Sequence, residues 1–528
     1  MSIFAEYVPR IDYIHPLPWT VPLTPLAAAL PPLLYYVALV LLPPFPSNPV
    51  PRLIAISRNV IALLALLLFL RLPFRYYLPF SVGLTYQLAL VGQYGAARIC
   101  DTFFISRYLI KDVHIPRRVI YTQVPRTPKA EAPGPDADSY FSLHFLLPNE
   151  GAPITEHAES QSGLPTSTWD RLSWALELEL AMRGAGFAWS SADIRHSKRT
   201  WSPSVADRVH SIILHVLPLV LASWAIIRGV QQKYLAPSTP RSEGEGVFDE
   251  LPYLMQAVLT ASLGAFLMAV FSLGHSIFAI LLSTLRPHPL SYFPSLYSKK
   301  VWEICSVREF WSYGWHRLFS RLFLVYGVWP GEMVERALLR KSADEPADVG
   351  KVLGAFLSSG VVHSLAGYTV VPGGLPRASA ELWFFVENGI AVIVEESVRR
   401  IVIQSRKKTD QSQRQGDQVS APTVHRWYDL IVGKVWWIFV LLYTGRNFAR
   451  GKLQFSRDQN HGHRWLIIHP RLGNRWPGQG NIVHRTAALR SLSGNQLSVC
   501  WMSMVAYNED CSLFERDRNL VNTMMAGG

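Results

Sequence analysis

Long apolar segments alternate with polar ones along this chain. A helix that crosses a bilayer needs about 20 mostly apolar residues, because the hydrocarbon core is about 30 Å thick. The segments that approach this requirement are 23–43, 53–71, 78–97, 209–230, 252–285, 318–333, 350–371, 382–402 and 427–445. The pattern therefore predicts an all-α, multi-pass integral membrane helical bundle of about eight or nine transmembrane helices.

Segment 252–285 is too long for one straight span, and it predicts either a tilted helix or a helix with a re-entrant turn near Gly274 and His275. The later segments are less apolar and contain ionisable side chains such as His363, Glu387 and Lys434. An ionisable residue at the middle of a membrane costs about 2.5–3.5 kcal/mol on insertion scales. We therefore expect such side chains to face the interior of the bundle or a wet cavity.

The polar segments divide the chain into four parts. Residues 1–104 hold N-terminal transmembrane helices, 105–205 form a large polar loop, 206–450 form the membrane core, and 451–528 form a basic polar tail. The core is interrupted by 403–425, which by its composition is a solvated linker.

Composition excludes an ordinary soluble enzyme and a disordered chain. Apolar residues make up 49% and charged residues 17%, against about 25% charged in typical soluble proteins. The net charge is +13, and the basic residues lie between apolar segments, so we expect an anionic membrane surface as partner and no nucleic acid. The spacing of the four cysteines fits neither a disulfide scaffold nor a zinc site, and no metal is expected.

His363 is the first candidate for chemistry, because it stands at the centre of a predicted span. At four-residue steps its helix face carries Ala355, Ser359 and Gly367, and Gly360 lies one turn away on the same side. Small residues around one imidazole leave room for a substrate or for a closely packed helix. A neutral histidine can act as a general base. A buried histidine that is hydrogen-bonded between two helices explains the pattern equally well.

A second candidate group contains Trp311, Trp315 and His316. The two tryptophans are four residues apart and share a helix face, and tryptophan favours the membrane–water interface. The alternative explanation is an interfacial anchor. Farther along, Glu395 or Glu396 could orient a catalytic group or form an ion pair with a nearby arginine.

These elements together resemble the wax-synthase-like branch of the membrane-bound O-acyltransferases (MBOAT superfamily), of the fungal natural-product acetyltransferase type. The segments that carry the resemblance are FPSLY at 293–297, SVREFW followed by WH at 306–316, and FLSSGVVH at 356–363, with weaker matches at 183–187 and 384–395. Many family members have an acidic residue after the membrane histidine, where this chain has Ser364.

The resemblance implies an enzyme that transfers an acyl group, in most cases acetyl from acetyl-CoA, to a hydroxyl of a lipophilic metabolite such as a terpenoid. By this analogy His363 removes the hydroxyl proton, and His316 positions the donor or stabilises the developing oxyanion. Trp311 and Trp315 would form the wall of the reaction chamber.

Further roles follow from the same resemblance. Ser359, Gly360 and Arg308 are expected to contact substrate. Arg317 and Arg321 are expected to bind the anionic acyl-CoA at the water-exposed entrance of the reaction chamber. The acyl-CoA acts as a co-substrate, and no cofactor is expected to be bound permanently. The partners are the bilayer, acyl-CoA and a lipophilic alcohol, and the location is the endoplasmic reticulum membrane.

Two alternatives stay open at the level of sequence. One is a wax ester synthase that joins a long-chain acyl-CoA to a fatty alcohol. The other is a transporter or receptor, although the chain lacks the inverted repeat typical of many transporters. The acceptor, the acyl chain length, the membrane orientation and the oligomeric state stay open.

Overall fold

The structure of the protein is a computed structural model. The structure describes residues 17, 19–43, 52–79, 82–106, 120–123, 154–157, 164–165, 167–182, 187, 204–230, 233, 247–285, 293, 296–297, 299–316, 318–342, 345–370, 375–413 and 427–468. Most of the polar loop, most of the expected linker and the tail beyond 468 lie outside these residues.

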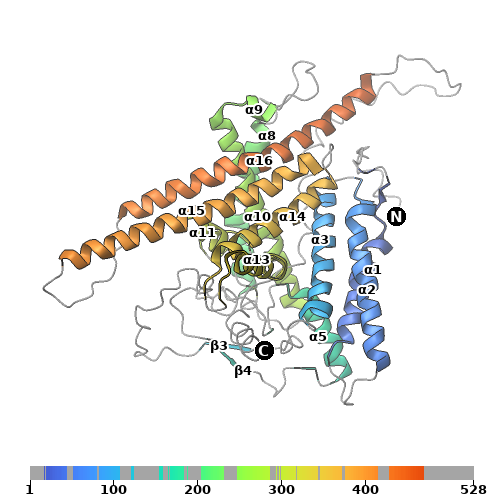
Figure 1. Ribbon diagram of the computed structural model, residues 1–528. Helices are drawn as coiled ribbons and strands as arrows, with labels where there is room; N and C mark the ends of the chain where they lie inside the picture. Colours follow the sequence, from blue (N-terminus) through green and yellow to red (C-terminus); the bar gives the residue numbers. More distant parts are fainter. Residues whose placement is uncertain are drawn as a thin grey trace.

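The all-α architecture is confirmed (Figure 1). The helices that correspond to the apolar segments are α1 (Pro25–Val40), α2 (Arg52–Arg75), α3 (Val82–Ile99), α7 (Val205–Ser211) with η3 (Ile212–Val216) and α8 (Leu217–Val230), α10 (Tyr253–Leu285), α12 (Ser320–Phe323) with η8 (Leu324–Val328) and α13 (Trp329–Leu339), α14 (Asp348–Tyr368), α15 (Leu375–Gln413) and α16 (Trp427–Ile468). The described strands form two small pairs, β1 (Val21–Pro22) with β2 (Tyr76–Tyr77) and β3 (Ile120–Gln123) with β4 (Ile154–His157).

Among the described residues, five helices are long and apolar enough to cross a membrane. They are Arg52–Arg75, Val205–Val230, Tyr253–Ser283, Asp348–Tyr368 and Tyr428–Arg450. This number is smaller than the eight or nine expected. Helix α1 is apolar but has only 16 residues, and α3 and α15 carry more polar side chains.

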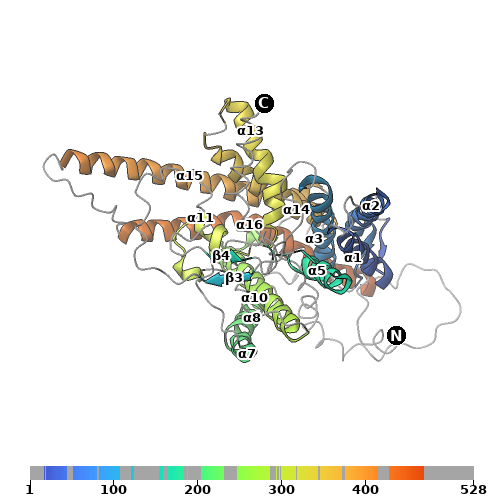
Figure 2. The ribbon, with the colours of Figure 1, turned by 90° about the horizontal axis from the view of Figure 1, so that it is seen from below.

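Three helices are longer or more regular than the sequence indicates. Helix α10 runs without a break for 33 residues, so the expected re-entrant turn near Gly274 and His275 is absent, and the segment is a single helix as the first alternative requires. Helix α15 continues to Gln413, into the expected linker, and α16 continues to Ile468, beyond the boundary placed at 450. Both long helices are seen extended in Figures 1 and 2.

The N-terminal helices form a unit at one side of the molecule (Figures 1 and 2). Helix α5 (Thr168–Leu180), which begins after the N-cap Ser167, packs against α1. Buried side chains of these helices form one apolar cluster that includes Tyr35, Ala38, Ala62, Ala65, Phe69, Phe103, Trp174 and Leu178. A second cluster joins α3 to α14 through Tyr86, Ala89, Leu90, Ala366 and Val370. The N-terminal unit is thereby fixed against the helix that carries His363.

Helices α13 and α14 form a hairpin with backbone-to-backbone contact. A Cβ atom added to Gly331 would meet the carbonyl oxygen of Gly350, and one added to Gly354 would meet that of Gly327. The continuous segment of η8 and α13 contributes the pair Gly327 and Gly331, and α14 contributes the pair Gly350 and Gly354. This G-x-x-x-G spacing is the small-residue pattern that lets membrane helices approach closely.

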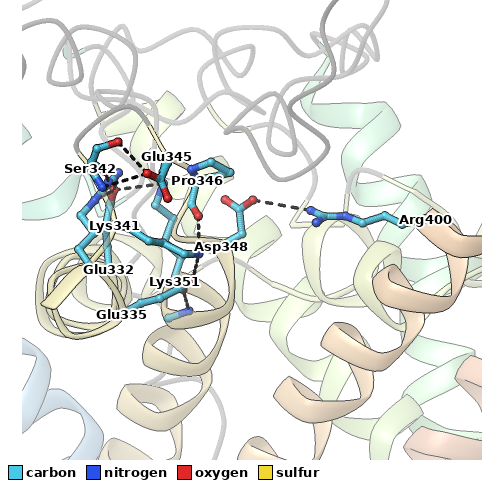
Figure 3. Close-up of polar contacts among 11 residues, drawn as sticks. Glu332, Glu335, Lys341, Ser342, Glu345, Pro346, Asp348, Lys351 and Arg400 are labelled. Carbon is cyan, nitrogen blue, oxygen red and sulfur yellow. Dashed lines mark hydrogen bonds and ion pairs between the residues drawn. The ribbon is translucent and has the colours of Figure 1, made fainter. Parts of the chain in front are cut away.

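A polar network closes the loop end of this hairpin (Figure 3). The Glu335 carboxylate accepts hydrogen bonds from the Lys341 ammonium and from the backbone N–H of Gly350. Glu332 lies 3.4 Å from the Lys351 ammonium, measured from Oε1 to Nζ. The network reaches α15 through Asp348 and Arg400, whose Oδ2 and Nη2 are 3.8 Å apart. These contacts fix the position of the start of α14, the helix that carries His363.

Candidate active site

Three helices meet at His363. Its Nδ1 lies 2.7 Å from the hydroxyl oxygen of Tyr86 on α3, and the same hydroxyl donates a hydrogen bond of 2.6 Å to Oε2 of Glu381 on α15. The distance from His363 Nδ1 to Glu381 Oε2 is 3.9 Å. Tyr86 and Glu381 are buried, while 17% of the His363 side chain is exposed.

An aromatic side chain fixes the other side of the imidazole. Phe385 of α15 stacks on His363 with ring centroids 4.8 Å apart and an angle of 23° between the planes. Helices α14 and α15 can come this close because a Cβ on Gly360 would collide with Leu382. Gly360 thus has a packing role here, and Ser359 beside it is buried.

A continuous row of rings joins the two candidate histidines. From His363 and Phe385 it passes to Trp311, whose ring centroid is 5.8 Å from that of Phe385. Trp315 follows at 6.0 Å from Trp311, and His316 at 5.0 Å from Trp315. We call these five residues the aromatic row. Both tryptophans therefore lie between the histidines.

Phe271 of α10 covers the far end of the aromatic row, with its ring centroid 4.4 Å from that of His316. The row thus extends from the α3–α14–α15 junction to α10. His316 and His363 belong to one continuous aromatic cluster, although 46 other residues separate them in the sequence.

Trp311 is held in place by a buried amide. It lies in η7 (Phe310–Gly314), and its indole Nε1 donates to Oδ1 of Asn388 on α15 at 3.1 Å. The Asn388 amide nitrogen donates in turn to the hydroxyl of Thr444 on α16 at 2.9 Å. The indole is therefore oriented by two helices.

Two carboxylates of α15 hold the segment that precedes Trp311. Glu395 accepts hydrogen bonds from the backbone N–H groups of Val307 and Arg308, at 2.8 and 3.3 Å. Glu396 forms an ion pair with Arg308, with Oε1 2.5 Å from Nη1, and its side chain is only 2% exposed. Burial lowers the pKa of the Arg308 guanidinium, and the charge of Glu396 opposes part of that effect. Glu395 therefore holds the backbone before Trp311, and Glu396 has the expected ion-pair role, since it also lies 3.5 Å from Arg399.

The polar side chains of α15 that build this site are seven residues apart. Glu381, Asn388 and Glu395 fall on one face, because seven residues are only about 20° short of two full helical turns. Each contacts a different segment: Glu381 binds α3, Asn388 binds η7 and α16, and Glu395 binds α11 (Val307–Glu309). We call this set the α15 polar stripe.

The structure does not favour a donor-binding role for Arg321. Its Nε and Nη2 donate to the two carboxylate oxygens of Asp101, at 2.7 and 3.0 Å, and Nη2 also donates to Ser106. All three residues are buried. This guanidinium therefore joins η1 (Cys100–Ile105) to α12 within the fold. Arg317 lies outside the described residues.

Sequence reasoning missed Tyr86, Glu381 and Asn388. Tyr86 lies in the weakest early apolar segment, and its contact with His363 spans 277 residues, so only the fold brings the two together. The signal that could have indicated the α15 polar stripe is the seven-residue spacing of Glu381, Asn388 and Glu395 in the sequence. Among the described residues, no group of three or more His, Cys, Asp or Glu side chains could hold a metal ion.

Comparison with known proteins finds a family similarity in the part of the chain that contains these residues. Residues 293–387 match the membrane bound O-acyl transferase family, so the resemblance to that family is confirmed. The match includes both candidate histidines, both tryptophans and Glu381. Together with the five apolar helices, it shows an all-α membrane protein that is similar to the membrane bound O-acyl transferases over residues 293–387.

Two fungal proteins are similar to this chain. Acetyltransferase eriL of Hericium erinaceus is 26% identical over 259 residues, which cover 49% of this chain and 65% of that protein. O-Mevalon transferase yanI of Aspergillus niger is 26% identical over 322 residues, which cover 57% of this chain and 68% of that protein. The chain thus spans about two thirds of each relative's length. No solved structure matches it.

Proposed function

We propose that this chain transfers an acyl group, acetyl from acetyl-CoA, to a hydroxyl of a lipophilic secondary metabolite such as a terpenoid or meroterpenoid. The observation that carries the proposal is the position of His363: inside the family match, at a junction of three helices, with its imidazole fixed by Tyr86 and Phe385. The name of one similar protein, acetyltransferase eriL, supports acetyl as the transferred group. The proposed location is the endoplasmic reticulum membrane.

The proposed reaction is a direct transfer. The alcohol oxygen attacks the thioester carbonyl carbon, a C–O bond forms and the C–S bond breaks. His363 accepts the hydroxyl proton as general base, a role worth about 10²–10⁴-fold in rate, and passes it to the CoA thiolate as that group leaves. Trp311 and Trp315 present apolar faces to the acceptor, and His316, at the other end of the aromatic row, faces the donor.

Basic side chains near Arg308 support placing the anionic donor beside the part of α15 that contains Glu395 and Glu396. Arg308 itself is neutralised by Glu396. Arg399 and Lys299 also pair with carboxylates, those of Glu396 and Glu309, but their side chains are 47% and 40% exposed to solvent. Exposed ammonium and guanidinium groups attract the phosphates of CoA without a large desolvation penalty. Arg399→Glu is therefore expected to raise the KM for acetyl-CoA several-fold and to leave kcat within about twofold, since uniform binding affects KM alone.

The central test uses microsomes that contain the full chain. They receive labelled acetyl-CoA and a panel of terpenoid and long-chain alcohols, beside His363→Ala and His316→Ala microsomes with equal protein content. Labelled ester that forms with the unaltered chain and falls at least about 100-fold in His363→Ala supports the proposal. Full activity in His363→Ala would overturn the assignment of the base.

The same assay separates the alternatives. Ester formation from palmitoyl-CoA and fatty alcohols, without any from acetyl-CoA, would replace the proposal with wax ester synthesis. Absence of transfer from every donor, in folded and membrane-inserted protein, would contradict the proposed activity and favour a transporter or receptor.

A further inference from the structure

Tyr86 bridges His363 and Glu381, and its single hydroxyl proton restricts how the three side chains share hydrogen bonds. The Tyr86 hydroxyl donates to Glu381 Oε2 at 2.6 Å. It cannot donate the same proton to His363, so at the 2.7 Å contact its oxygen accepts the proton of Nδ1. The neutral imidazole then carries its lone pair on Nε2.

We propose that Tyr86 and Glu381 are positioning residues that hold His363 in the tautomer with its proton on Nδ1. The inference rests on the proposed function, because it assigns the proton acceptor of that reaction to Nε2 of His363. The tautomer and orientation of a catalytic histidine are commonly set by the partner of its other ring nitrogen. Here that partner is a tyrosine, and the carboxylate acts through it.

We call the hydrogen-bonded pair of Tyr86 and Glu381 the relay. It also responds to the charge that forms during the reaction. When Nε2 accepts the hydroxyl proton, the imidazole becomes positive, and the Glu381 carboxylate stands 3.9 Å from Nδ1. An opposite charge at this distance stabilises the imidazolium. The geometry is rigid, because Tyr86 and Glu381 are buried and the Phe385 ring stacks on the imidazole. Neither positioning residue needs to touch the substrate.

Kinetics of the full chain in microsomes test the relay. Glu381→Gln replaces an acceptor-only group with an amide that can donate to the Tyr86 oxygen. The Tyr86 hydroxyl would then turn toward Nδ1 and leave the proton on Nε2, the wrong tautomer. We expect kcat to fall roughly 100-fold or more in Glu381→Gln and roughly 10-fold in Tyr86→Phe, with the KM for donor and acceptor within about twofold.

Matched controls separate this role from a structural one. Glu387→Gln changes a carboxylate on the same helix, and Tyr94→Phe removes a buried hydroxyl from α3. Both controls should keep kcat within about twofold. In a His363→Ala background, Tyr86→Phe and Glu381→Gln should cause no further loss, since residues that act as a unit are not additive. Further losses of the same size in that background would overturn the relay.

Nitrogen-15 NMR of histidine-labelled protein in bilayers provides a readout that is independent of activity. The His363 signals are identified by subtracting the His363→Ala spectrum. We expect a protonated Nδ1 and an unprotonated Nε2 in the unaltered chain at neutral pH, and the reverse in Glu381→Gln. A proton on Nε2 in the unaltered chain would overturn the inference.

The two proposals fail in distinguishable ways. An active His363→Ala protein contradicts the proposed base, whatever the NMR shows. An inactive His363→Ala protein beside a fully active Glu381→Gln protein contradicts the relay alone.

Discussion

The indole nitrogen of Trp311 donates a hydrogen bond to the side-chain oxygen of Asn388, 77 residues farther along the chain. Asn388 is completely buried, and its amide nitrogen contacts the Thr444 hydroxyl. One amide therefore joins η7, α15 and α16 at the middle of the aromatic row. The orientation of the Trp311 ring depends on this amide.

Asn388→Leu should destabilise the protein and lower acyl transfer. The substitution leaves the indole N–H without its acceptor, and each buried polar group without a partner costs about 1–3 kcal/mol. Thermal unfolding in detergent, followed by tryptophan fluorescence, measures the effect. In a Trp311→Phe background the same substitution should cost less, and an equal loss in both backgrounds would show that the hydrogen bond contributes nothing.

Breaking the Arg308–Glu396 ion pair should be among the most destabilising polar changes in the site. Glu396 is 2% exposed, and removing one partner of a buried pair costs about 3–5 kcal/mol. Arg308→Met is therefore expected to lower the melting temperature markedly. Arg399→Met, which alters a 47% exposed arginine near the same carboxylate, should cost less than about 1 kcal/mol. Similar losses in the two variants would argue against the buried pair.

Gly354→Ala should destabilise the α13–α14 hairpin. The added methyl group would collide with the carbonyl oxygen of Gly327, and overpacking of this kind costs about 1–3 kcal/mol. Gly264→Ala in α10 is the control, because nothing lies within 4 Å of its Cβ position and a glycine-to-alanine change in an open helix gains about 0.5–1 kcal/mol. Opposite shifts of the melting temperature are expected, and shifts of the same sign would contradict the close contact.

The stability of the N-terminal unit should fall as the pH rises. Burial raises the pKa of Glu179 to about 8 from its ordinary 4.5, against the opposing charge of Arg98. The unfolded chain therefore loses this proton at lower pH than the folded chain, so stability declines as the pH rises from about 4.5 through about 8.

Glu179→Gln tests this expectation, because it removes the ionisable group. Melting temperatures at pH 5.5 to 8.5 should fall less steeply in the variant than in the unaltered chain. Glu177→Gln, on the same helix, should keep the original slope. Parallel curves for all three proteins would assign the pH dependence to other groups.

The helices could be predicted from the sequence, because each apolar segment must satisfy its backbone hydrogen bonds internally to enter a membrane. His363 stood out for a related reason: an ionisable residue at mid-membrane needs an interior position. The length of α15 could not be predicted in this way, since its C-terminal half is polar and resembles a solvated linker.

Contacts between side chains that are far apart in the sequence could not be predicted. The sequence places Arg321 near His316, but the fold pairs it with Asp101, which is 220 residues earlier. Two patterns were nevertheless present in the sequence. The G-x-x-x-G spacings at 327–331 and 350–354 are typical of a close helix contact, and the heptad spacing of Glu381, Asn388 and Glu395 is typical of one polar helix face.

The α15 polar stripe limits how this part of the chain can change length during evolution. A single inserted residue between Glu381 and Glu395 would rotate everything beyond it by about 100° around the helix axis. Glu381 could then keep its contact with Tyr86 only if Glu395 lost its contact with Val307. Insertions and deletions should therefore be rarer in this interval than amino-acid replacements, because a replacement removes one contact and a length change removes several at once.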